Sequence, residues 1–203
     1  MTIDEIMRVA PVIPVLVLDG PHDPAELAAT LVEAGLPVIE VTLRTPGAID
    51  ALAAMAKVPG AVVGAGTVLN VRQLEEAGSA GAEFIVSPGL TEPLARAAEG
   101  IPFLPGVSSA ADIMRGLDLG LDRFKFFPAE AAGGIPLLKA LSAPFAGLRF
   151  CPTGGITAAS ALDWLALDAV ACVGGSWIVP KAASLEQIGE LARQAAALPR
   201  STG

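Results

Sequence analysis

The sequence is poor in the residues that build metal centres and covalent cross-links. Its 203 residues include two cysteines, Cys151 and Cys172, and a single histidine, His22. Both cysteines lie in apolar, strand-like stretches, so we expect two buried, reduced thiols. His22 lies in a Gly-Pro-His-Asp-Pro loop, where we expect it to be solvated. Because zinc sites draw on clusters of Cys and His, we predict no metal site.

Positive charge and long apolar runs are also scarce. Thirteen Lys and Arg against 21 Asp and Glu give a formal net charge of -8, which disfavours nucleic acid or an anionic membrane as a partner. Hydrophobic residues make up 53% of the chain, yet no charge-free stretch reaches the ~18 residues of a spanning helix. Asp4 and Glu5 follow the first methionine closely, which is atypical of a secretory signal. We therefore expect a cytoplasmic protein whose strands are buried on both faces.

The remaining pattern is an alternation of β-branched strand segments and amphipathic helices. Strands are predicted at 12–18, 38–44, 61–67, 84–87, 103–107, 123–127, 149–153 and 169–173. Helices are predicted after a capping box at Thr2 and then at 23–34, 46–57, 70–80, 92–98, 109–120, 135–141, 158–167 and 184–198, leaving a frayed tail at 199–203. The whole chain, 1–203, is predicted to be one α/β domain, a (β/α)8 TIM barrel with a short N-terminal helix. A doubly wound parallel sheet is the alternative, since it uses the same βαβ unit.

The segment 123–130, Arg-Phe-Lys-Phe-Phe-Pro-Ala-Glu, places a lysine inside an aromatic strand. Successive strand side chains point to opposite faces, so Lys125 and Phe127 share one face while Phe124 and Phe126 share the other. Burying an unpaired ammonium is costly. Lys125 is therefore either an edge-strand residue that reaches water or a buried nucleophile.

Polar residues gather at the predicted carboxyl ends of the strands, where barrel enzymes carry their chemistry. Glu40, Thr42 and Arg44 share one face of the second strand by period-two alternation. In one interpretation Glu40 and Arg44 neutralise each other, or Glu40 neutralises Lys125. In the other, Arg44 binds a substrate carboxylate through its bidentate fork and Glu40 moves a proton.

Two glycine-rich segments, 153–155 and 174–176, follow the seventh and eighth predicted strands. Barrels commonly bind phosphate at these two loops, through backbone N–H groups and a helix N-terminus. Glycine lets the backbone approach the anion closely, although each pair of glycines alone is also typical of a tight turn. Their occurrence together in these two loops favours a phosphate site.

With these segments placed, the chain closely resembles the 2-keto-3-deoxy-6-phosphogluconate (KDPG) aldolases, which double as 4-hydroxy-2-oxoglutarate (KHG) aldolases. The resemblance depends on motifs that span nearly the whole chain in order. They are Val38–Arg44, Val63–Val68, Ile85–Gly89, Phe124–Glu130, Phe150–Ile156 and Gly174–Trp177.

The resemblance implies a role for each matching position. Lys125 would form a Schiff base, and Glu40 would act as general acid and base. The residues implied at the pyruvyl end of the substrate are Arg44 and Thr67 on the carboxylate, Thr153 beside it, and Pro88 and Phe127 in the pocket wall. Those implied at the phosphate are Gly154, Gly155, Gly175 and Ser176.

The implied reaction is cleavage of KDPG to pyruvate and glyceraldehyde 3-phosphate, without cofactor or metal because the lysine imine serves as the electron sink. A KHG aldolase side activity is expected, and family members are typically homotrimers, which suggests the same assembly here. Three alternatives remain open. They are 2-dehydro-3-deoxy-6-phosphogalactonate aldolase, a non-catalytic sugar-phosphate-binding or assembly barrel, and a phosphosugar isomerase or epimerase. The isomerase or epimerase would give Lys125 no chemical role.

Overall fold

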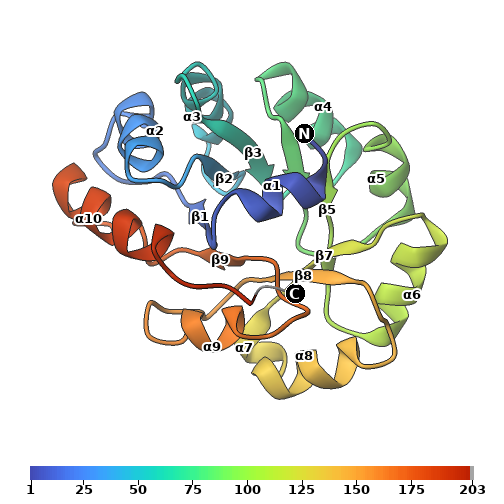
Figure 1. The fold of residues 1–203 in the computed structure, drawn as a ribbon. Helices are drawn as coiled ribbons and strands as arrows, with labels where there is room; N and C mark the ends of the chain where they lie inside the picture. The colour runs from blue at the N-terminus through green and yellow to red at the C-terminus, as the bar shows by residue number, and fades with distance from the viewer. Residues whose placement is uncertain (202–203) are drawn as a thin grey trace.

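The computed structural model describes residues 1–201 and is a parallel α/β fold (Figure 1). The strands are β1 (Val12–Leu16), β2 (Val38–Thr42), β3 (Val62–Gly66), β4 (Phe84–Val86), β5 (Phe103–Leu104), β6 (Gly106–Val107), β7 (Arg123–Phe126), β8 (Arg149–Pro152) and β9 (Val173–Gly175). The helices are α1 (Ile3–Val9), α2 (Pro24–Glu33), α3 (Ala48–Met55), α4 (Val71–Ser79), α5 (Glu92–Ala97), α6 (Ala110–Asp118), α7 (Ala129–Ala132), α8 (Gly134–Ser142), α9 (Ala161–Leu165) and α10 (Leu185–Ala196).

The strands form two parallel sheets. Six strands are ordered β5-β4-β3-β2-β1-β9, and three are ordered β6-β7-β8. In the first sheet Glu40 of β2 is in register with Gly64 of β3, and in the second Lys125 of β7 is in register with Gly106 and Cys151. The chain passes from the six-stranded sheet to the three-stranded sheet at Pro105, which separates β5 from β6.

Two apolar layers hold the strands in place. The outer layer packs strand residues such as Phe124, Phe126 and Phe150 against helix residues such as Trp164, all fully buried. The inner layer consists of the opposite strand faces together with two side chains of α1: Ile13, Val38, Phe84, Val86, Leu104, Cys151, Ala171 and Cys172, with Ile6 and Met7. Figure 1 shows α1 crossing the middle of the strands while the other helices lie around them.

Most predicted elements are present, with shorter strands and several differences. The eighth strand was predicted at 169–173, but β9 is Val173–Gly175, so Gly174 and Gly175 lie in the strand rather than after it. Thr157 was expected to begin a helix at 158, but residues 157–160 form a turn held by the Ser160 and Thr157 side chains, and α9 starts at Ala161. Helix α7 was not predicted. The tail was expected to be frayed, yet of its described part Ser201 donates from its backbone N–H to the Leu165 carbonyl at 3.0 Å.

Two expectations about apolar segments can be compared with the described residues. Cys151 and Cys172 are both free and buried, as predicted. A hydrogen bond with Cys151 and burial raise the pKa of the Cys172 thiol well above its usual range. Within residues 1–201, no helix combines the length and the apolarity needed to cross a membrane.

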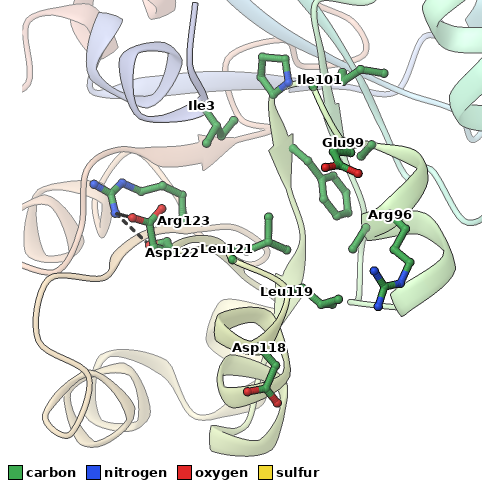
Figure 2. A pocket seen from close by; sticks show the side chains of 15 residues that line it. Ile3, Arg96, Glu99, Ile101, Asp118, Leu119, Leu121, Asp122 and Arg123 are labelled. Atoms are coloured by element: carbon green, nitrogen blue, oxygen red, sulfur yellow. Dashed lines mark hydrogen bonds and ion pairs between the residues drawn. The ribbon is translucent and has the colours of Figure 1, made fainter.

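Helix α1 is held to the start of β7 by an ion pair. Arg123 Nε donates to Asp4 Oδ1 at 2.5 Å, and Arg8 donates to the other carboxylate oxygen at 2.8 Å. Arg123 also lines a cavity of about 400 Å³ with Ile3 and Asp122, at the end of the strands where α1 lies (Figure 2). Burial opposes ionisation of Asp4, but the hydrogen bonds and charges of Arg123 and Arg8 outweigh it and lower the pKa of Asp4 below 3.8.

We expect Asp4→Asn to lower the free energy of unfolding at pH 7 by about 0.5–1 kcal/mol, the range for a partly exposed ion pair. A carboxylate with a lowered pKa stabilises the fold above its unfolded pKa and loses that effect as the pH falls through its folded pKa. Urea denaturation at pH 7 and again at a pH below the lowered pKa of Asp4 measures this, and the two proteins should converge at the acidic pH. Glu33→Gln, at the exposed end of α2, is the control. An Asp4→Asn protein as stable as this control at pH 7 would contradict the assignment.

Candidate active site

Lys125 is buried on the inner face of β7 and pairs with Glu40 of β2. The Lys125 Nζ donates to Glu40 Oε1 at 3.0 Å and lies 3.4 Å from Oε2. Lys125 is 6% exposed and Glu40 is 3% exposed. Of the alternatives left open by the sequence, the edge-strand lysine is wrong, and the partner of Glu40 is Lys125.

The space for this pair depends on Gly66 at the end of β3. A methyl group at Gly66 would lie 2.2 Å from Glu40 Oε1, closer than any real contact. Glycine inside a strand often marks such an approach. Gly66 lies within the Val63–Val68 motif, but the sequence alone assigned it no role.

Phe127 connects the lysine to the loop after β8. Its ring centroid lies 5.3 Å from Lys125 Nζ, within the range of a cation–π contact. A Cβ at Gly154 would lie 3.3 Å from Cε2 at the edge of the Phe127 ring. Lys125 and Phe127 therefore point to the same side of β7, as the alternation of strand side chains predicts.

Arg44 and Thr67 form a second polar pair, outside the buried core. Strand β2 ends at Thr42 rather than at Arg44, and a turn carries the exposed Arg44 beyond the strand. The Arg44 Nε donates to Thr67 Oγ1 at 3.3 Å. Thr67 adopts a φ of 57°, and this left-handed conformation costs a β-branched residue about 1–3 kcal/mol. Such strain is typical of positions at active sites and ligand-binding sites.

Thr153 and the glycines beside it join the ends of β8 and β9. Thr153 is 6% exposed and forms an isolated parallel bridge with Gly174. A Cβ at Gly174 would lie 2.2 Å from Thr153 Oγ1, so glycine is required there. Gly154 and Gly155 have φ values of 102° and 83°, in the left-handed region that glycine adopts freely.

Of the predicted site residues, Glu40 and Phe127 are linked to Lys125 by the hydrogen bond and the cation–π contact, whereas Pro88, Gly175 and Ser176 lie at the ends of other strands. Pro88 packs against Gly106, where an added Cβ would lie 2.2 Å from the Pro88 carbonyl oxygen. Gly175 is buried, and Ser176 follows it at the exposed end of β9. The expected helix N-termini do not follow the glycines directly, because α9 begins at Ala161 and α10 at Leu185.

The loop after β8 is fixed by a contact that the sequence pattern did not predict. Trp164 Nε1 of α9 donates to Glu130 Oε1 at 2.9 Å, and the Glu130 backbone N–H donates to the Gly154 carbonyl at 3.0 Å. A Cβ at Gly155 would lie 2.7 Å from Glu130 Cβ. The position of Glu130 in the 123–130 motif was the available signal.

Comparison with known proteins agrees with this geometry. The family model for KDPG and KHG aldolases matches residues 3–193. A curated KHG/KDPG aldolase of Escherichia coli is 52% identical, with 95% of this chain and 93% of the relative covered. The crystal structure of 2-keto-3-deoxy-6-phosphogluconate aldolase from Zymomonas mobilis has a TM-score of 0.97 at 54% identity, covering 100% of both chains. The KDPG aldolase of Legionella pneumophila, with pyruvate captured as a covalent carbinolamine, has a TM-score of 0.93 at 45% identity, covering 97% of this chain and 99% of the other.

A buried amine beside a carboxylate on facing parallel strands is an arrangement that suits a Schiff-base lyase. This chain belongs to the KDPG and KHG aldolase family.

We expect Gly66→Ala to displace the Glu40 carboxylate and to lower kcat for KDPG cleavage roughly a hundredfold, the effect of misplacing a catalytic group by about 1 Å. Release of pyruvate, followed with coupled lactate dehydrogenase, measures this. Gly78→Ala in α4 is the matched control, since a Cβ there meets nothing within 4 Å. Full activity in Gly66→Ala would show that Glu40 does not need its present position.

Proposed function

We propose that this chain is a class I aldolase that cleaves KDPG to pyruvate and glyceraldehyde 3-phosphate, with KHG as a second substrate. The observation that carries the proposal is the buried Lys125 amine 3.0 Å from the buried Glu40 carboxylate. A sugar-phosphate binder or scaffold needs no nucleophile, and burying an ion pair is costly without a chemical use. The family match and the carbinolamine trapped in the Legionella relative support the same reaction type.

In the proposed mechanism, Lys125 Nζ gives up a proton, for which Glu40 is the adjacent acceptor, and attacks the C2 ketone. Glu40 returns this proton to the carbinolamine hydroxyl, which leaves as water and gives a protonated imine, and Glu40 is again a carboxylate. The C3–C4 bond then breaks with its electron pair moving toward the imine nitrogen, while Glu40, through a water, takes the C4 hydroxyl proton. Glyceraldehyde 3-phosphate leaves, and the enamine is protonated at C3 and hydrolysed to pyruvate.

The proposed binding groups flank this centre on two sides. Arg44 and Thr67 would hold the pyruvyl carboxylate. The Arg44 guanidinium fork suits a carboxylate, and the Thr67 hydroxyl already lies beside that guanidinium. Thr153, Pro88 and Phe127 would line the pyruvyl pocket, with Phe127 supported by its contact with the lysine.

At the other end of the substrate, the left-handed loop 154–155 and the end of β9 would hold the phosphate. The proposed residues are Gly154, Gly155, Gly175 and Ser176. Their backbone N–H groups and the serine hydroxyl supply the donors.

We also propose that the two sheets belong to one closed eight-stranded barrel in a single domain, 1–203. Strands β5 and β6 are two parts of one predicted strand on either side of Pro105, and the Thr153–Gly174 bridge links β8 to β9. We also propose, from the resemblance to this family alone, a cytoplasmic location and a homotrimeric assembly.

Lys125→Ala is expected to abolish turnover, because within residues 1–201 Lys125 is the amine that pairs with Glu40. Removing one partner of a buried pair also costs about 3–5 kcal/mol of unfolding free energy, so folding is checked by circular dichroism. Borohydride reduction with pyruvate should attach the adduct to the peptide containing Lys125 in wild type and in Lys139→Ala, the exposed-lysine control. A folded, fully active Lys125→Ala protein would end this proposal.

Glu40→Gln keeps the shape of the side chain and removes its basicity. We expect kcat to fall by about 10²–10⁴, the typical contribution of a general acid–base group. Borohydride trapping of pyruvate should be slower but still go to completion, since imine formation can use another proton acceptor and needs no C–C cleavage. Unchanged kcat would remove Glu40 from the proton-transfer role, and complete loss of trapping would show that imine formation cannot proceed without Glu40.

A further inference from the structure

A cavity of about 430 Å³ opens beside the proposed phosphate site. It reaches Ser176 at the end of β9 and is bordered by Val15 and Val17 at the end of β1. The loop between β1 and α2 and the segment after β9 complete its rim, with Asp19 and Lys181. The cavity is therefore continuous with Ser176 and lies between two loops from opposite ends of the chain.

The proposed phosphate donors carry no positive charge. Gly154, Gly155 and Gly175 offer backbone N–H groups, and Ser176 offers a hydroxyl. A phosphate monoester bears a charge of about -1.5 to -2 at pH 7, and the chain itself carries a net charge of -8. A local cation would offset both. Among the described residues lining the cavity, Lys181 supplies the Lys or Arg side chain.

Lys181 is held at the cavity by a carboxylate on the facing loop. Its Nζ lies 2.7 Å from Asp19 Oδ2, while 72% of the lysine side chain remains exposed to solvent. The same two loops meet at His22, whose Nε2 is 2.8 Å from the Ala183 carbonyl oxygen. His22 was predicted to be a solvated loop residue; it is half-buried and joins the loops, so the rim that carries Lys181 is tied down at a second point.

We propose that Lys181 pairs with the phosphate of the substrate and is a specificity residue for phosphorylated over unphosphorylated keto acids. The proposal rests on the function proposed above and on the position of the phosphate at Ser176. In the free enzyme Asp19 keeps the ammonium at the rim. When the phosphate binds, the Lys181 Nζ donates to a phosphate oxygen, because the dianion attracts it more strongly than a single carboxylate does.

The test compares kcat/KM for KDPG with kcat/KM for unphosphorylated 2-keto-3-deoxygluconate. In Lys181→Gln the ratio should fall about fivefold, as expected for one solvent-exposed charge pair, and Lys181→Arg should keep it. Raising the ionic strength from about 0.01 M to 1 M should reduce the difference in this ratio between wild type and Lys181→Gln, because the screening length shrinks from ~30 Å to ~3 Å. Lys57→Gln, in the turn before β3, removes the same charge at the far end of the strands and should leave the ratio unchanged.

Asp19→Asn separates a direct role of Lys181 from a structural role of the ion pair. If Lys181 contacts phosphate, removing the facing carboxylate should leave the ratio equal or higher. The proposal would be overturned if the substrate ratio fell as far in Asp19→Asn as in Lys181→Gln. It would also be overturned if Lys181→Gln and Lys57→Gln had the same ratio.

Trapping of pyruvate on Lys125 in the Lys181→Gln protein keeps the two proposals distinguishable. Pyruvate carries no phosphate, so trapping should be as complete as in wild type. Failure of trapping in wild type itself would refute the proposed function, whereas normal trapping with an unchanged substrate ratio would refute only the role of Lys181.

Discussion

The ion pair between Lys125 and Glu40 is the constraint on which the rest of the site depends. Both side chains are almost fully buried, and taking two charges out of water costs several kcal/mol per ion unless their geometry is good. The 3.0 Å contact offsets part of that cost, while leaving an amine beside a proton acceptor. An apolar pair would stabilise the core at least as well. The charges are therefore explained by chemistry rather than by stability.

The pair also explains how the two sheets must be arranged. Glu40 lies on β2 of the six-stranded sheet, and Lys125 lies on β7 of the three-stranded sheet. Their contact joins residues 85 positions apart across the interior. Beneath them, apolar strand residues and two side chains of α1 fill the space, so water has little access from that end. Gly66 has no side chain, which leaves space for the Glu40 carboxylate.

Much of this arrangement follows from sequence periodicity, and its failures have physical causes. Alternation along a strand correctly separated Lys125 and Phe127 from the buried Phe124 and Phe126. The same rule extended β2 to Arg44, but the chain turns after Thr42, because a local Arg44 N–H to Thr42 C=O hydrogen bond replaces the ladder. The partner of Glu40 could not be chosen from sequence, since Arg44 and Lys125 both satisfied the pattern. That choice depends on which strands face each other across the interior.

The pairing of each cation near the proposed site affects how an anionic substrate is recognised. In an acidic protein, the three cations placed near the proposed substrate each have a close partner: Lys125 with Glu40, Arg44 with Thr67, and Lys181 with Asp19. Carboxylate partners hold two of them in position but cancel their field at a distance. Long-range steering of an anionic substrate is therefore weak, and discrimination must come from short contacts made after it arrives. Short contacts require backbone that can approach closely, which is what the left-handed glycines at 154 and 155 provide. Left-handed glycine backbone and paired cations therefore both favour recognition of an anion by short contacts in an acidic protein.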